Sequence, residues 1–170
     1  MNRIALCGFM GCGKTTVANA LENKYNLKHI DTDKYIEEQE NMTIAEIFSK
    51  FSEGYFRDKE FKAIKELSEN CDCILSLGGG AVQFERNVKA LKNNGYTIVF
   101  LNTDLDVIKE RLKNDNTRPL LKSNDIDALF KKRFDIYKKN SDVIISCNKE
   151  DGETLAKIIA NTLTKEGKNS

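Results

Sequence analysis

The sequence has very little proline and histidine, no tryptophan and no long apolar run, as an ordinary globular protein can. Its 170 residues include one proline, one histidine and no tryptophan, and no apolar run reaches the length of a membrane span. The apolar residues at its start lead directly into a glycine-rich loop, which is not the layout of a signal peptide. We therefore expect a cytoplasmic protein with no membrane partner.

Neither sign of charge is in excess. Lys and Arg number 27 and Asp and Glu number 26, so the net charge is only +1. Because strong attraction to nucleic acid requires a positive field, we expect no nucleic-acid partner.

The five cysteines are an odd number, and Cys71 and Cys73 have neither a zinc nor a redox spacing. Cys7, Cys73 and Cys147 lie in apolar runs, which predicts that they are small buried side chains. We expect no disulfide framework from this pattern.

The length of the chain predicts one domain, residues 1–170. Apolar runs that resemble strands alternate with helical patterns, which is typical of an α/β protein with a parallel sheet. The expected strands are residues 3–7, 27–30, 73–77, 97–101 and 143–146. Between the second and third of these, residues 34–69 hold more helix than a crossover needs, and Thr43 to Glu46 has the form of a capping box. This surplus predicts an inserted substrate-binding subdomain.

The strongest motif runs from Gly8 to Thr16 and matches the phosphate-loop pattern G-x-x-x-x-G-K-[ST]. A strand pattern precedes it and a helical pattern follows. The glycines allow backbone N–H groups to point at a phosphate, and the following helix directs its positive end there. Lys14 is expected to reach the terminal phosphates, and the Thr15 hydroxyl to bind Mg²⁺. The motif predicts a nucleoside triphosphate site formed by Gly11, Cys12, Gly13, Lys14, Thr15 and Thr16.

Two further polar or glycine-rich segments follow expected strands. Asp31 and Asp33 come after the second strand, and Gly78, Gly79 and Gly80 come directly after the third. The glycines suggest backbone held close to a ligand, although a flexible turn remains an open alternative for them. For Asp31 and Asp33 the open alternative is a solvated acidic turn. His29 is expected at a surface position.

Read together, these segments resemble bacterial shikimate kinase over roughly residues 3–163. The matching pieces are Gly8–Gly11 with the phosphate loop, Asp31–Asp33, Ile44–Phe48, Phe56–Arg57 with Glu60, Gly78–Gly80, Arg118–Leu121, and Arg133 with Tyr137. The resemblance implies transfer of the terminal phosphoryl group of ATP to the 3-hydroxyl of shikimate. It also implies a fold like the nucleoside monophosphate kinases, with a five-stranded parallel sheet, substrate-binding helices at 34–69 and a lid at 113–124. We expect a monomer.

The resemblance assigns the acceptor side of the site. Asp33 matches the aspartate that hydrogen-bonds the accepting hydroxyl and can take its proton, and Arg57 and Arg133 match the arginines that clamp the shikimate carboxylate. The backbone contact to shikimate matches Gly78, Gly79 and Gly80, most directly Gly79.

On the donor side, the resemblance gives Arg118 the role of the lid arginine that folds over the phosphates and, with Asp33 and Lys14, a catalytic role. Arg111 matches an arginine that stacks on adenine. Asp31 matches a carboxylate that holds Mg²⁺ through water. Cys12 and Thr16 depart from the small residue and the serine that the family often has. No residue near 147–152 is assigned to adenine.

Other interpretations remain open at this point. Taken singly, Arg57, Arg111 and Arg133 are typical surface charges. Asn148 to Asp151 fits the N-x-x-D motif of GTP-binding switch proteins, but no D-x-x-G follows the strand that ends at Leu77. A related kinase for gluconate or for a nucleoside monophosphate is the second alternative.

Overall fold

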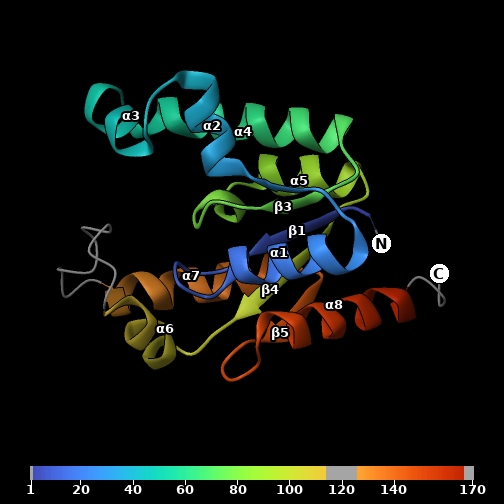
Figure 1. The fold of residues 1–170 in the computed structure, drawn as a ribbon. Helices are drawn as coiled ribbons and strands as arrows, with labels where there is room; N and C mark the ends of the chain where they lie inside the picture. Colours follow the sequence, from blue (N-terminus) through green and yellow to red (C-terminus); the bar gives the residue numbers. More distant parts are fainter. Residues whose placement is uncertain (1, 114–125, 167–170) are drawn as a thin grey trace.

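The computed structural model describes residues 2–113 and 126–166 (Figure 1). Five parallel strands form one sheet within these residues, in the order β2-β3-β1-β4-β5. The strands are β1 Ile4–Cys7, β2 His29–Asp31, β3 Ile74–Ser76, β4 Thr97–Asn102 and β5 Val143–Ser146. The predicted α/β fold with a five-stranded parallel sheet is therefore confirmed.

The second strand begins two residues later than expected because Leu27 does not join the sheet. Its side chain is buried with Val17 and Leu21 instead. His29 was expected at the surface, and this is wrong. The side chain is half-buried, with Nε2 2.9 Å from the Ser76 hydroxyl on the neighbouring strand. Burial lowers its pKa.

Helices cover both faces of the sheet (Figure 1). Alternate residues of a strand point to opposite faces, and β1 shows this directly. Ile4 and Leu6 pack with α1 (Lys14–Tyr25) and α8 (Gly152–Glu166). Ala5 and Cys7 pack with α4 (Glu53–Asn70), α5 (Glu85–Asn93), α6 (Leu105–Leu112) and α7 (Ile126–Asn140). The structure also has α2 at Thr32–Glu40, α3 at Ile44–Lys50 and the short 3₁₀ helix η1 at Ala81–Gln83.

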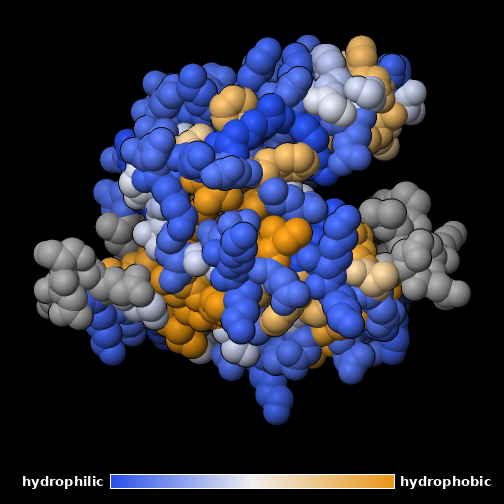
Figure 2. Space-filling view, turned by 180° about the vertical axis from the view of Figure 1, so that it is seen from behind, coloured by the Kyte–Doolittle hydropathy of each residue, from blue (hydrophilic) through white to orange (hydrophobic). Residues whose placement is uncertain are grey.

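The region between β2 and β3 consists of α2, α3 and α4, which share a separate apolar cluster of Ile36, Ile47, Phe56 and Ala63. The capping box is confirmed, because the Thr43 hydroxyl accepts from the Glu46 N–H at 3.2 Å and the Glu46 carboxylate accepts from the Thr43 N–H at 2.8 Å. Seen from behind, the molecule is hollowed between these helices and the rest (Figure 2).

The buried cysteines were predicted correctly: Cys7, Cys73 and Cys147 are all buried with free thiols. The expected lid at 113–124 falls outside the described residues, apart from Lys113 at the end of α6. None of the helices in residues 2–113 and 126–166 has the length and apolar character of a membrane span.

Candidate active site

The phosphate loop connects β1 to α1. Gly11 and Gly13 have φ values of 77° and 99°, a left-handed conformation that other residues rarely adopt. Lys14 is the first residue of α1, and its ammonium group donates to the carbonyls of Gly8 at 2.9 Å and Phe9 at 3.2 Å. These bonds fold the lysine side chain back over the loop. The N-terminus of α1 points toward the same loop.

Arg111 joins this loop to the segment after β5. Its Nη1 donates to the carbonyls of Gly11 and Cys12, both at 3.4 Å, and its Nη2 donates to the carbonyl of Cys147 at 3.0 Å. The Thr103 hydroxyl also donates to the Cys12 carbonyl, at 3.2 Å, a contact that the sequence did not reveal. The Cys12 side chain is buried. Arg111 thus lies beside the loop.

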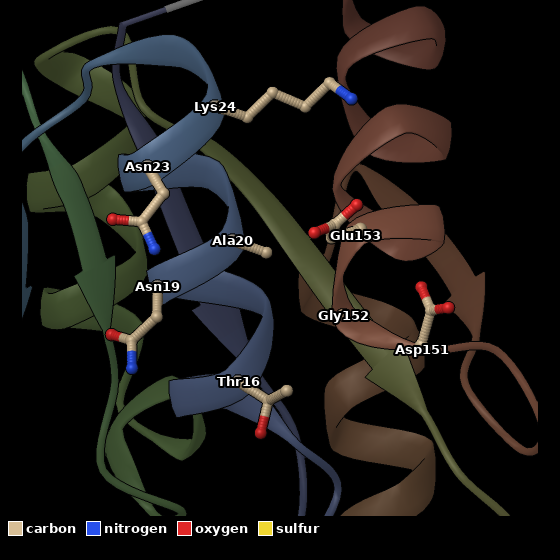
Figure 3. Close-up of a pocket in the computed structure, with 8 residues that line it drawn as sticks. All are labelled: Thr16, Asn19, Ala20, Asn23, Lys24, Asp151, Gly152 and Glu153. Atoms are coloured by element: carbon tan, nitrogen blue, oxygen red, sulfur yellow. The ribbon is translucent and has the colours of Figure 1, made fainter.

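An open groove lies along α1 beside the start of α8 (Figure 3). Its lining residues are polar apart from Ala20 and Gly152: Thr16, Asn19, Ala20, Asn23, Lys24, Asp151, Gly152 and Glu153. Gly152 lies so close to α1 that a Cβ there would be 2.9 Å from Thr16 Cγ2 and 3.1 Å from the Thr16 carbonyl oxygen. Of the predicted site residues that the structure describes, only Thr16 lines this groove, so the groove is not the acceptor site.

The acceptor side begins where β2 ends. The Asp31 carboxylate caps α2 by accepting from the N–H groups of Asp33 at 3.0 Å and Lys34 at 3.2 Å. Thr32 is buried; its hydroxyl donates to the Ser76 carbonyl at 3.1 Å and accepts from the Gly78 N–H at 3.2 Å. Thr32 therefore links the segment that carries Asp31 and Asp33 to the glycine turn after β3 by hydrogen bonds. Nothing in the local sequence marks this residue.

Two charged side chains lie directly against the turn. A Cβ placed on Gly78 would be 2.6 Å from Asp33 Oδ1, and one placed on Gly79 would be 3.2 Å from Arg133 Nη1. Asp33 Oδ1 and Arg133 Nε are buried and have no hydrogen-bond partner among the described residues. Buried polar atoms are normally paired, so these two atoms are suited to hydrogen-bonding a polar substrate.

Arg57 approaches the same turn from α4. A Cβ on Gly80 would be 2.9 Å from both its Nη1 and its Nη2. Nε and Nη2 donate to Glu53 at 3.2 and 3.1 Å, and Nη1 donates to Glu60 at 3.1 Å. The Glu60 side chain is 1% exposed and the Glu53 side chain 67% exposed. Arg57 is thus both the partner of Glu60 and part of the site, and two carboxylates fix the plane of its guanidinium.

Tyr137 holds the middle of the turn. Its hydroxyl donates to the Gly79 carbonyl at 2.6 Å, and burial raises its pKa. Arg133 lies one turn earlier on the same face of α7. Tyr137 was expected beside Arg133 but without a role of its own, and their four-residue spacing was the signal available in the sequence.

Asp33 is the most perturbed carboxylate of the site. Burial, with the neighbouring charge of Asp31, raises its pKa to about 6, against the opposing effect of Lys14 and Arg57. A carboxylate with a pKa in this range can accept a proton near neutral pH. Burial also raises the pKa of Glu60, again opposed by Arg57.

This pKa predicts a pH-dependent stability. Between pH 3.8 and about 6 the carboxyl ionises in the unfolded chain but stays protonated in the folded one, so the cost of burying Asp33 grows with pH and is complete above about pH 6. Asp33→Asn should raise the free energy of unfolding by about 2–3 kcal/mol at pH 8, and the gain should disappear near pH 4. Urea denaturation across this range measures it. A gain that does not vary with pH would contradict the assignment.

The residues of the N-x-x-D motif are used within the chain. Asn148 accepts from the Asp104 N–H and donates to the Asp104 carboxylate, both at 2.8 Å. Asp151 accepts from the Thr154 N–H at 2.7 Å. Both side chains therefore have local structural partners, which removes the main argument for a GTP-binding switch.

A phosphate loop on a parallel sheet, facing a glycine turn that gathers a buried carboxylate and two arginines, defines a phosphate-loop kinase for a small molecule. The family model described as Shikimate kinase matches residues 10–164. The chain belongs to the shikimate kinase family.

Named relatives support this membership over nearly the whole chain. The shikimate kinase of Sulfurihydrogenibium sp. (strain YO3AOP1) is 40% identical over 167 residues, which cover 97% of this chain and 98% of that protein. The structure of the Acinetobacter baumannii shikimate kinase in complex with shikimate matches with a TM-score of 0.89 and 31% identity, covering 98% of this chain and 94% of that one. The Aquifex aeolicus enzyme matches with a TM-score of 0.85 and 36% identity, covering 97% and 98%.

The structure brings together most of the predicted site residues. Asp33, Arg57, Arg133 and the three glycines converge on one turn, and Lys14 and Arg111 contact the phosphate loop. Arg118 lies outside the described residues.

Proposed function

We propose that the protein transfers the terminal phosphoryl group of ATP to the 3-hydroxyl of shikimate, giving shikimate 3-phosphate and ADP. The observation that carries the proposal is the convergence of Asp33, Arg57 and Arg133 on the Gly78–Gly80 turn in a chain of the shikimate kinase family. The relative from Acinetobacter baumannii, whose structure contains shikimate, supports the choice of acceptor.

The acceptor residues suit a small hydroxylated acid. Arginine presents a planar fork that matches a carboxylate, and Arg57 and Arg133 approach neighbouring glycines of one turn. Asp33 Oδ1, buried and unpaired among the described residues, can accept a hydrogen bond from the 3-hydroxyl and then its proton. The backbone of Gly78, Gly79 and Gly80 would border the bound acid.

The donor residues act by position and charge. Phosphoryl transfer passes through a loose transition state, so neutralising the phosphate oxygens matters more than base strength. In our proposal the backbone of Gly11 to Thr16 wraps the phosphates, Lys14 neutralises them, and Arg111 borders the adenine. Arg118 is assigned to the phosphates by family resemblance alone.

Mg²⁺ would accompany the nucleotide. The described residues contain no group of three or more His, Cys, Asp or Glu side chains able to hold a metal by themselves. Magnesium at phosphate sites usually keeps several waters and takes only one or two protein ligands. The exposed Thr15 hydroxyl, as a direct ligand, fits this pattern. So does the Asp31 carboxylate, acting through water, since its helix cap uses Oδ1. When bound, Mg²⁺ supplies charge neutralisation on the phosphates.

The remaining organisation is part of the same proposal. The chain would act as one domain, 1–170, with substrate-binding helices at 34–69 and a lid at 113–124. We assign it to the cytoplasm, where ATP is present, with ATP and shikimate as its partners. A monomer suffices, because every proposed contact to the substrates comes from this one chain.

The test is a coupled assay of ADP release with Mg-ATP, with and without shikimate, and with gluconate and CMP as control acceptors. We expect ADP release that depends on shikimate and is lost in Asp33→Ala. Release with gluconate or CMP but not with shikimate would keep the phosphate-loop kinase and overturn the acceptor.

Gly80→Ala tests the carboxylate clamp. Its Cβ would lie 2.9 Å from both Nη atoms of Arg57, so the guanidinium must shift. We expect the KM for shikimate to rise about 10- to 100-fold, the equivalent of losing a charge-assisted hydrogen bond, with the KM for ATP unchanged. Gly54→Ala is the control, because a Cβ there makes only ordinary contact, at 3.6 Å from the Ser52 hydroxyl. An equal rise in both KM values would refute the clamp.

A further inference from the structure

Asn87 is a buried polar residue that the proposed reaction does not use. It lies on α5, and the residue is 1% exposed. Its amide Nδ2 donates to the Ala81 carbonyl at 2.9 Å and to the Glu60 carboxylate at 3.4 Å. Both partners adjoin the acceptor site: Ala81 follows Gly80 in the chain, and Glu60 binds Arg57.

The chemistry of these neighbours sets the orientation of the amide. A carbonyl and a carboxylate can only accept, so the NH₂ group must face them. The opposite atom, Oδ1, is buried and has no partner among the described residues. An unpaired buried acceptor is unfavourable for stability. What Asn87 contributes at this position is therefore the pair of N–H donors of its amide.

We infer that Asn87 is a positioning residue for the clamp on the substrate carboxylate. It holds Glu60 in place, and Glu60 in turn holds the Nη1 side of Arg57. Through the Ala81 carbonyl it also holds the end of the glycine turn. One side chain thereby fixes the separation between the arginine on α4 and Gly80, against which both Nη atoms lie. This inference rests on the proposed function.

The chain provides a matched control at the C-terminal cap of the same helix. Asn94 follows α5, and its Nδ2 donates to the Ser68 hydroxyl of α4 at 3.1 Å and to the Ala90 carbonyl at 2.9 Å. It therefore links α5 to α4 by the same kind of bonds. Neither of these two bonds reaches Glu60, Arg57 or the glycine turn. Asn94→Ala removes an equal group from a position outside the clamp.

The experiment compares Asn87→Ala with Asn94→Ala, with wild type measured first. For Asn87→Ala we expect the KM for shikimate to rise about tenfold and the KM for ATP to stay within about twofold. The ratio of kcat/KM for shikimate over its methyl ester should also fall about tenfold, because a loosened Arg57 recognises the carboxylate less well. Asn94→Ala should lower the melting temperature without changing that ratio.

The outcomes separate the inference from the proposed function. A wild type without shikimate-dependent ADP release overturns the proposed function, and this inference with it. An active wild type with an unchanged ester ratio in Asn87→Ala overturns the inference alone, as does an equal fall in Asn94→Ala. If Asn87→Ala does not fold, Asn87→Ser undergoes the same comparison, and the same results decide.

Discussion

Replacing Asp33 with alanine should lower kcat about 10²- to 10⁴-fold while ATP still binds, which is the usual range for the loss of a positioned acid–base group. Asp33 is the carboxylate that lies against Gly78, with Oδ1 buried and unpaired among the described residues. Under the proposed function, its removal deprives the accepting hydroxyl of both its orientation and its proton acceptor. Steady-state ADP release and the binding of an ATP analogue measure the two parts of the prediction.

Asp33→Asn separates the two roles of this carboxylate. An amide keeps an oxygen that can accept from the hydroxyl but is a very weak base. Because base strength matters little in a loose transition state, we expect this variant to retain more activity than Asp33→Ala. Asp58→Ala, which removes an exposed carboxylate of α4 paired with Arg86, should leave turnover unchanged. Wild-type turnover in Asp33→Ala would eliminate Asp33 as the acceptor-side residue.

Replacing Lys14 with methionine should lower kcat about 10³-fold, the scale of losing a preorganised charge beside a transferring phosphoryl group. The ammonium group is held against the phosphate loop by the Gly8 and Phe9 carbonyls at 2.9 and 3.2 Å. Methionine has a similar length but carries no charge. The measurement is kcat under saturating ATP and shikimate.

The control for this variant is Lys24→Met, which removes an exposed lysine from the last turn of the same helix and should leave kcat within about twofold. Thermal denaturation of Lys14→Met checks that the loop survives the loss of two hydrogen bonds. A higher KM for ATP with an unchanged kcat would show that Lys14 binds the ground state and transition state equally.

Local patterns predicted those parts of the site that local geometry determines. The phosphate loop follows β1 and precedes α1 because strand, glycines and helix are contiguous in the sequence. The capping box of Thr43 and Glu46 spans one helical turn and was predicted correctly. Helix α4 begins at Glu53, where the Ser52 hydroxyl accepts from the Tyr55 N–H and so caps the helix.

The other contacts depend on chain segments that meet only in the fold. Thr32 and Gly78 are 46 residues apart, and Tyr137 and Gly79 are 58 apart. His29 was placed wrongly because its partner Ser76 lies 47 residues away on another strand. No periodicity spans such separations. The roles of Arg57 and Arg133 came from family resemblance, because their local surroundings are those of ordinary surface charges.

The two halves of the site differ in how their residues are distributed along the sequence. The phosphate loop is one uninterrupted segment, residues 8–16. The acceptor side is assembled from separate segments on β2 and α2, on α4, after β3 and on α7, and its contacts cross between them. A short segment with a strand before it and a helix after it can be retained as one unit during evolution. A new acceptor preference, by contrast, requires concerted changes in several distant segments. In descendants of this sequence, the use of a nucleotide should therefore outlast the identity of the molecule that receives the phosphate.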